Sequence, residues 1–181
     1  MISLDKKIDG IAKYIHNNSS NPSSVEVLKY SLTILLNYLL VFVTVMIICA
    51  FTGNVMDGFI ALILLPLLRT FSGGVHLKTA KSCNYLSTIL LLIAIYTKYN
   101  YFYIGIFLNI LSILILLFYA PSGIKNISKL DEKYHPLLKI ISILIVSVNF
   151  FVESSLASNV FFIQSITLLK TSQKIVEKCK L

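Results

Sequence analysis

The sequence has little charge. Only 13% of its 181 residues are Asp, Glu, Lys or Arg, whereas soluble domains carry about 25%. Hydrophobic residues make up 56%, against roughly 45 to 50% in soluble domains. Since so little polar surface cannot coat a compact domain, lipid must surround much of the chain. The composition excludes an ordinary soluble fold and predicts an integral membrane protein, with residues 1–181 as a single domain.

Cysteine is also scarce. The three cysteines, Cys49, Cys83 and Cys179, are odd in number and too scattered for a disulfide framework, so at least one thiol is free. The first thirty residues lack the continuous apolar core of a cleavable signal peptide, and we expect the first spanning helix to act as the insertion signal. No GxxxG pattern marks a helix interface, so the sequence leaves the oligomeric state open.

Apolar patterning predicts an all-α, polytopic fold. Residues 1–17 place apolar side chains at helical spacing with lysines between them, which predicts an amphipathic helix on the membrane surface. A capping box at Ser23 and Glu26 is expected to start a helix that runs to about Thr52. Five further apolar runs bring the total to about six membrane helices or partial helices: 58–68, 85–97, 101–120, 137–152 and 154–169.

Two of these runs are short. Residues 58–68 and 85–97 number 11 and 13, whereas crossing a hydrocarbon core of about 30 Å takes roughly 20 helical residues. We therefore expect the polar stretch 69–84 between them to lie partly at membrane depth, in contact with protein or a wet cavity. The last two runs contain dispersed polar residues, and we expect them to be tilted or closed against one another by hydrogen bonds of Ser142, Ser147, Asn149 and Ser158.

The basic residues are distributed unevenly. With six crossings and the N-terminus inside, 15 of the 16 Lys and Arg residues lie on the cytoplasmic side, including the basic tail 170–181, and only Lys98 lies outside. This asymmetry predicts that both termini are cytoplasmic. The formal charge of +8 therefore reflects topology, and no nucleic-acid partner is expected.

The stretch 69–84 contains the residue types of a nucleophilic site. It holds Arg69, which is the only arginine, followed by Gly73-Gly74, His76 and Cys83. A cysteine thiolate is a nucleophile, a histidine can move its proton, and an arginine or backbone N–H groups can hold an oxyanion. Seven helical residues rise about 10.5 Å, so His76 and Cys83 meet only if the helix is broken or rearranges. A plain packing role for the cysteine, and a simple turn at the glycines, are the alternatives.

This pattern resembles the accessory gene regulator B (AgrB) family of quorum-sensing peptide processors. The likeness rests on Arg69, Gly73-Gly74-Val75-His76 and Cys83 between short apolar helices, with Tyr119-Ala120-Pro121 closing a later helix. The family usually has an acidic residue next, where this chain has Ser122-Gly123. The resemblance implies that Cys83 is the nucleophile and His76 its partner, with Arg69 and Gly74 in support. It implies neither a metal nor a cofactor.

The resemblance further implies a substrate and a place in the cell. A membrane cysteine endopeptidase of this family would cleave the C-terminal part of a small AgrD-type propeptide through a Cys83 thioester. The propeptide's own cysteine would then displace Cys83 to form a cyclic thiolactone. The expected location is the bacterial plasma membrane, as a multi-pass protein with its active site toward the cytoplasm, and a homodimer is compatible with the resemblance.

Two other functions compete. Asp57-Gly58 and Ala61 suggest a CDP-alcohol phosphotransferase, but Asn54 and Leu62 replace required residues and no later pair of Asp residues completes a Mg²⁺ site. That interpretation is discarded. A non-enzymatic transporter or assembly protein, with Arg69 and His76 lining a polar path, stays open and needs no reactive Cys83.

Overall fold

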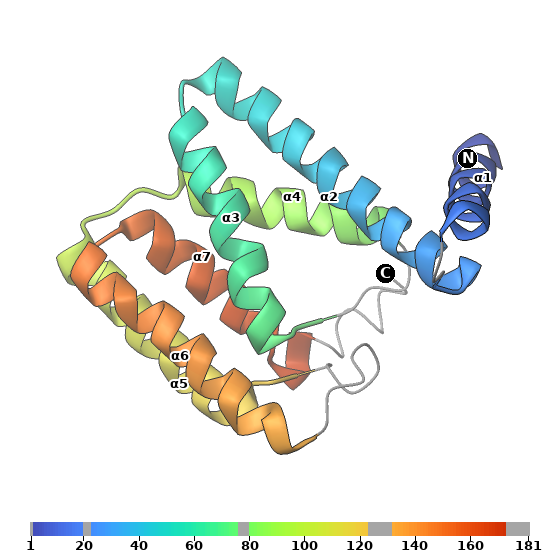
Figure 1. Ribbon diagram of the computed structural model, residues 1–181. Helices are drawn as coiled ribbons and strands as arrows, with labels where there is room; N and C mark the ends of the chain where they lie inside the picture. Colours follow the sequence, from blue (N-terminus) through green and yellow to red (C-terminus); the bar gives the residue numbers. More distant parts are fainter. Residues whose placement is uncertain (1, 20–22, 76–79, 123–131, 173–181) are drawn as a thin grey trace.

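The structure, a computed structural model, describes residues 2–19, 23–75, 80–122 and 132–172. This part of the chain is almost entirely helical (Figure 1), so the predicted all-α membrane fold is confirmed. In chain order the elements are α1 (Ile2–Asn18), α2 (Val25–Thr52), α3 (Val55–Ser72), α4 (Ala80–Tyr96), the π-helical turn η1 (Tyr101–Gly105), α5 (Ile106–Tyr119), the 3₁₀ turn η3 (Glu132–Tyr134), α6 (His135–Val152) and α7 (Ser155–Ile166).

Four helices in the described ranges are long and apolar enough to span a membrane: α2, α3, η1 continued by α5, and α6. The expected bounds 58–68 are wrong, because α3 continues through Arg69 to Ser72 and has 18 residues. Its polar end stays helical since Thr70 donates its hydroxyl to the Pro66 carbonyl (2.8 Å) within the helix. The apolar parts of α4 and α7 are shorter, at Ser82–Tyr96 and Ser155–Ile166.

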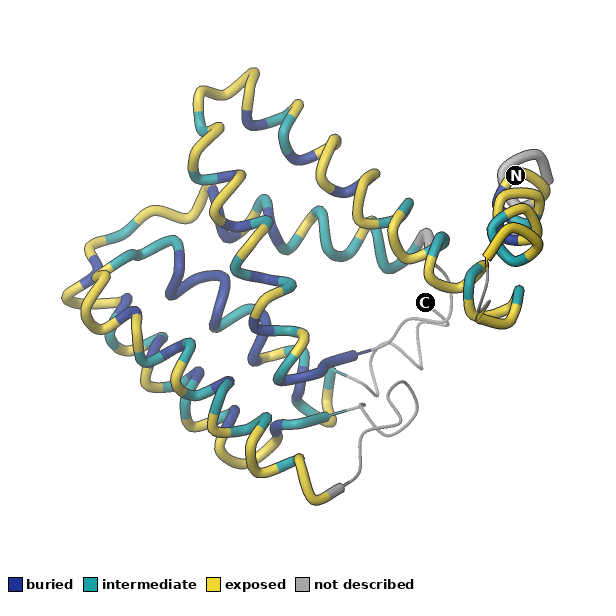
Figure 2. The backbone as a smooth tube through the Cα atoms, in the orientation of Figure 1, coloured by how far each residue is buried: buried dark blue, intermediate teal, exposed yellow. Residues whose placement is uncertain are grey.

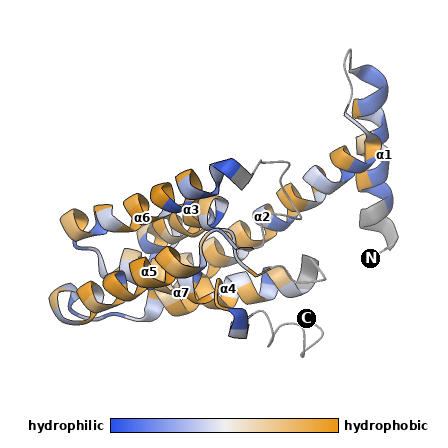
Figure 3. Ribbon diagram, turned by 90° about the horizontal axis from the view of Figure 1, so that it is seen from below, coloured by the Kyte–Doolittle hydropathy of each residue, from blue (hydrophilic) through white to orange (hydrophobic). Residues whose placement is uncertain are grey.

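The helices form two groups joined by α3 and α7. One apolar cluster gathers buried side chains of α2, α3 and α4 around Val160 of α7, and the other joins α3, α5, α6 and α7 around Leu68 and Phe161. Most large apolar side chains lie outside these clusters and are exposed (Figures 2 and 3). An exposed apolar belt of this extent is what lipid-facing helices require.

Hydrogen bonds between amides hold α5, α6 and α7 together. The buried Asn149 side chain of α6 lies within hydrogen-bond distance of Asn109 Oδ1 on α5 (3.2 Å) and of Ser158 Oγ on α7 (2.9 Å). The predicted closure of α6 against α7 is therefore confirmed for Asn149 and Ser158. It is wrong for Ser142 and Ser147, whose hydroxyls donate to carbonyls one turn back in their own helix, as serines in apolar helices often do.

Three connections meet at one end of the bundle. Asp57, Lys98 and Glu153, in or beside these connections, line one cavity of about 330 Å³. The Lys98 ammonium donates to Asp57 (3.2 Å), and the Tyr99 hydroxyl donates to Asn159 Oδ1 (2.7 Å). Burial raises the pKa of Tyr99 to about 12, so its hydroxyl stays protonated further into the alkaline range than that of an exposed tyrosine. The C-terminal ends of α3 and α5 and the N-terminal ends of α4 and α6 lie at the other end of the bundle (Figure 1).

Helix α1 packs against the start of α2, at the periphery of the molecule (Figures 1 and 3). Asp9 pairs with Lys13 on α1 (2.8 Å) and with Lys29 on α2 (3.6 Å). The hydrogen bond from Lys13, supported by both ammonium charges, holds the pKa of the Asp9 carboxyl below its usual value. The N-cap of α2 is Ser24, one residue after the expected cap, because its hydroxyl is the one that accepts from Val27 N (3.4 Å).

Candidate functional site

The chain breaks between α3 and α4 at two glycines. Gly73 has φ +76° and Gly74 has φ +146°, backbone conformations that L side chains rarely adopt. Gly73 therefore ends α3, and its N–H donates to the Arg69 carbonyl (2.9 Å). Since Gly73, Gly74 and Val75 are not helical, a single helix from Arg69 to Cys83 is excluded. The segment between His76 and Ala80 lies outside the described residues, so a break between His76 and Cys83 stays a prediction.

Backbone and amide hydrogen bonds fix this break to two distant segments. Gly74 N donates to Ser122 O and Ser122 N donates to Ser72 O, each at 3.0 Å. From α7, Gln164 Nε2 donates to Gly73 O at 2.7 Å. Backbone groups buried at membrane depth need such partners. We call this arrangement the Gly73–Ser122 joint; its partners Ser122 and Gln164 were not predicted from the sequence.

Arg69 binds the short segment that follows the joint. Its Nη2 donates to the Val75 carbonyl, and Val75 directly precedes His76 in the chain. A Cβ placed on Gly74 would lie 2.8 Å from Thr167 Oγ1 and 3.6 Å from Arg69 Nη1. The supporting positions predicted at Arg69 and Gly74 thus lie together, and only a glycine fits between the arginine and the end of α7.

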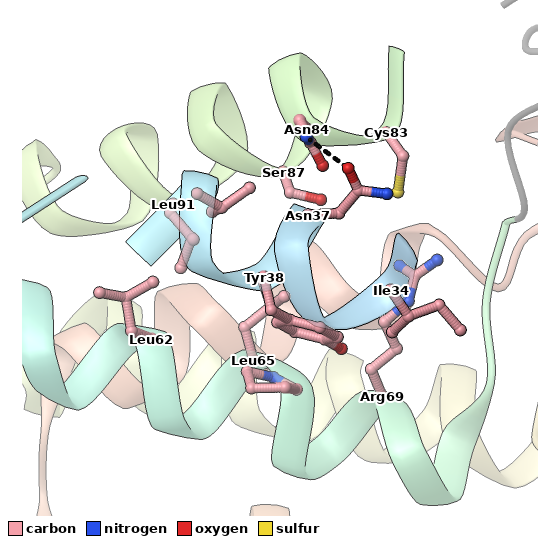
Figure 4. A pocket seen from close by; sticks show the side chains of 12 residues that line it. Ile34, Asn37, Tyr38, Leu62, Leu65, Arg69, Cys83, Asn84, Ser87 and Leu91 are labelled. Carbon is pink, nitrogen blue, oxygen red and sulfur yellow. Dashed lines mark hydrogen bonds between the residues drawn. The ribbon is translucent and has the colours of Figure 1, made fainter. Parts of the chain in front are cut away.

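Cys83 lies in the first turn of α4 and lines a small cavity (Figure 4). The cavity has a volume of about 140 Å³, and both Cys83 and Arg69 line it. Each of three helices contributes side chains at helical spacing: Ile34, Asn37, Tyr38 and Val41 from α2, Leu62, Leu65, Pro66 and Arg69 from α3, and Cys83, Asn84, Ser87 and Leu91 from α4. The cavity is therefore mainly apolar, with a few polar groups near the thiol.

Two amides in this cavity were missed in the sequence. Asn84 Nδ2 donates to Asn37 Oδ1 at 3.1 Å, which joins α4 to α2 beside Cys83. Asn37 is the only amide side chain in the 28 residues of α2. An amide inside an otherwise apolar stretch of a membrane helix is costly and is a candidate for a functional role. That signal was available in the sequence and would have pointed to Asn37.

The charge of Arg69 is uncompensated within the described ranges. The three ion pairs found there involve Asp9 and Asp57 and leave out Arg69. A half-buried cation with no carboxylate beside it favours an anionic group in the cavity. The same part of the chain contains no group of three His, Cys, Asp or Glu side chains that could hold a metal ion.

Some predicted residues cannot be placed. His76 and Cys179 lie outside the described residues, as does most of the basic tail 170–181. The approach of His76 to Cys83 therefore stays a prediction. Cys49, by contrast, is fully buried in the core of α2 and packs against Gly58, where an added Cβ would lie 2.7 Å from its Sγ. Cys49 therefore has a packing role.

Comparison with known families identifies the chain. The family model AgrB, accessory gene regulator B, matches residues 8–176 of the 181, so the chain belongs to this family. A search of curated proteins and a search of solved structures each found no match. Family membership places the chain in accessory gene regulator quorum sensing, in the processing of a propeptide at a bacterial membrane.

Proposed function

We propose that this AgrB protein is a membrane cysteine endopeptidase that cleaves the C-terminal part of an AgrD-type propeptide. Cys83 is the nucleophile and His76 is the general base and acid. One observation carries the proposal: Cys83 and Arg69, on different helices, line the same small cavity. The bond from Arg69 to Val75, the neighbour of His76 in the chain, supports a site built from both ends of the 69–84 stretch.

In the first step the Cys83 thiolate attacks the scissile carbonyl carbon of the propeptide. A carbon–sulfur bond forms and the carbonyl π electrons move to oxygen. When this intermediate collapses, the carbon–nitrogen bond breaks and His76 gives the leaving amine the proton that it took from the thiol. The N-terminal part of the propeptide is then held on Cys83 as a thioester, and the C-terminal part is released.

In the second step a cysteine of the propeptide attacks this thioester. One carbon–sulfur bond replaces another, Cys83 leaves as thiolate and takes back a proton, and the peptide closes into a thiolactone. This exchange is close to balanced in energy, so it must be faster than hydrolysis. The cavity wall is largely apolar, with side chains such as Leu62, Leu65 and Leu91, and it limits the access of water to the thioester.

The positive-inside distribution supports a cytoplasmic site. The joint follows the end of α3 and Cys83 stands in the first turn of α4, whereas Lys98 lies in the connection from α4 to η1, at the opposite end of α4. Along the sequence, Lys and Arg concentrate in the segments on the Cys83 side. We propose that both termini and the site face the cytoplasm. A basic face also attracts an acidic peptide segment.

The decisive experiment is co-expression with the tagged propeptide of the neighbouring reading frame. We expect cleavage in membranes by the wild-type protein and by Cys49→Ala. We expect none by Cys83→Ala or His76→Ala at equal protein levels. Cys49→Ala is the matched control, because it removes a thiol that lies in the packed core and not in the cavity.

The thioester is tested on the same samples. Mass spectrometry should find the Cys83 peptide of the wild type carrying the propeptide fragment, and neutral hydroxylamine should remove it. Cleavage that persists in Cys83→Ala would contradict the cysteine mechanism. No cleavage by the wild type would favour the non-enzymatic alternative, in which Arg69 lines a polar path.

A further inference from the structure

We infer that the Asn37 side chain is the oxyanion donor of this site: its Nδ2–H group binds the oxygen that becomes negative when Cys83 attacks a peptide carbonyl. Asn84 is the positioning residue that holds the Asn37 amide in the required orientation. This inference rests on the proposed function and adds to it a residue from α2, a helix that the 69–84 pattern does not include.

The position of Asn37 is the first argument. It lies on the face of α2 that lines the cavity, across from the first turn of α4, which carries Cys83. Figure 4 shows the Asn37 amide and the Cys83 thiol pointing into the same space. An oxyanion donor has to reach the carbonyl oxygen of a substrate whose carbon contacts the nucleophile, and this placement allows it.

The orientation of the amide is the second argument. Asn84 Nδ2 donates to Asn37 Oδ1 at 3.1 Å, so the carbonyl end of Asn37 is engaged and its NH₂ end is directed away from Asn84. Figure 4 shows that end on the side of Cys83. A donor that is already oriented before the reaction costs no reorganisation when charge develops.

Two other polar groups near the thiol each have one nitrogen engaged with the protein. Arg69 donates from Nη2 to the Val75 carbonyl, and Asn84 uses its amide nitrogen on Asn37. Within the described residues, Asn37 Nδ2 is the amide donor near Cys83 that has no hydrogen bond to the protein. In an apolar cavity such a donor binds a developing negative charge more strongly than it would in water.

The chemistry follows from these contacts. As the Cys83 sulfur bonds to the carbonyl carbon, the π electron pair moves to the oxygen, and Asn37 Nδ2–H donates to it. When the carbon–nitrogen bond breaks, the pair returns and the hydrogen bond weakens. Asn37 neither gains nor loses a proton. Its contribution is therefore made in the transition state and should appear in the rate of acylation.

The test compares two reactions of the same thiol in membranes. Asn37→Leu keeps the approximate volume of the side chain and removes the donor. We expect its single-turnover cleavage of the propeptide to fall about 100- to 1,000-fold, the usual effect of deleting one oxyanion donor. Alkylation of Cys83 by iodoacetamide, read by mass spectrometry, should keep its wild-type rate, since displacement of iodide develops no oxyanion.

A second variant and a control complete the design. Asn37→Asp keeps the acceptor for Asn84 and loses the donor, so it should be at least as slow in cleavage. Thr44→Val, two turns along α2, is the matched control: its hydroxyl donates to Leu40 O in its own helix, and we expect wild-type rates in both reactions.

Two results would overturn the inference. One is cleavage by both Asn37 variants at the wild-type rate. The other is an equal fall in cleavage and alkylation, which would give Asn37 a packing role only. Failure of the proposed function itself is distinguishable, because it appears as cleavage by Cys83→Ala or as no cleavage by the wild type.

Discussion

Both the backbone conformation and the close neighbours of Gly74 disfavour any larger residue there. Its φ is +146°, and a Cβ added there would lie 2.8 Å from Thr167 Oγ1, so Gly74→Ala meets both backbone strain and a steric clash. Strain of this kind costs about 1 to 3 kcal/mol. We expect Gly74→Ala to lower the thermal unfolding midpoint in detergent, followed by circular dichroism, and to weaken propeptide cleavage through displacement of Val75.

Gly10→Ala is the control for this substitution. Gly10 is an exposed helical residue of α1 with no atom within 4 Å of an added Cβ, and alanine there should be neutral or stabilising, by up to about 1 kcal/mol. Equal effects of the two substitutions would contradict the role assigned to Gly74. Both variants add the same methyl group, so a difference between them reports the local backbone and contacts at Gly74 and not the methyl group itself.

Individual site residues were only partly predictable. Arg69, Gly74 and Cys83 stand in one short stretch, where their chemistry is visible in the sequence, and the structure brings Arg69 together with each of the other two. Asn37 and Gln164 were missed because each acts across a helix interface. Their contacts, to Asn84 and Gly73, join residues 47 and 91 positions apart. The spacing of residues along the sequence does not show which residues of different helices will be in contact.

At the scale of elements, Asn149 determines how α6 turns into α7. Its side chain accepts from Ser154 N (3.1 Å) and donates toward Ser154 O, Ser158 Oγ and Asn109 Oδ1. Asn149→Leu has a similar volume and removes the hydrogen-bond partner of Asn109 Oδ1 and of Ser154 N, while Ser154 O keeps its bonds from Ser158. We expect a loss of about 1 to 3 kcal/mol in unfolding free energy, measured by denaturant titration of the detergent-solubilised protein.

Val148→Leu serves as the comparison for this helix. Val148 is 56% exposed on the outer face of α6, so a larger apolar side chain there should leave stability unchanged. A destabilisation as large as that of Asn149→Leu would mean that the amide network is not what joins these helices. The network also explains why α7, with only 12 residues, is held among longer helices.

The extent of the helices followed their apolar runs except beside the 69–84 stretch, where α3 continues to Ser72 and α4 begins at Ala80, before the expected residue 85. Hydropathy predicted the six apolar segments and the N-terminal amphipathic helix, because lipid imposes a simple rule on side chains. It ended the second segment too early, since it counted Arg69, Thr70 and Ser72 as a break. Thr70 bonds to its own helix and Ser72 is buried against Gln164, so their polarity is satisfied without leaving the helix.

At the scale of the whole molecule, the proposed orientation can be tested by labelling. In a background in which Cys49, Cys83 and Cys179 are Ser, we expect Lys98→Cys to react with a membrane-impermeant maleimide on intact cells. Lys170→Cys, at an exposed position after α7, should react only after permeabilisation. The reason is the distribution of Lys and Arg between the two ends of the bundle.

The opposite labelling pattern would reverse the topology and place Cys83 on the outer side. Lys98→Cys removes one exposed ion pair, with Asp57, and such pairs contribute only about 0 to 1 kcal/mol. The variant should therefore insert and fold like its parent, and its labelling reports orientation alone.

The Gly73–Ser122 joint and the cavity differ in how far they depend on particular side chains. In the joint, the hydrogen bonds from Gly74 N to Ser122 O and from Ser122 N to Ser72 O use main-chain atoms, so these two bonds do not require a particular side chain at position 122, proline excepted. The cavity, by contrast, is walled by side chains that can be exchanged one at a time. Substitutions among these cavity-lining side chains would let the same backbone framework accept different peptides.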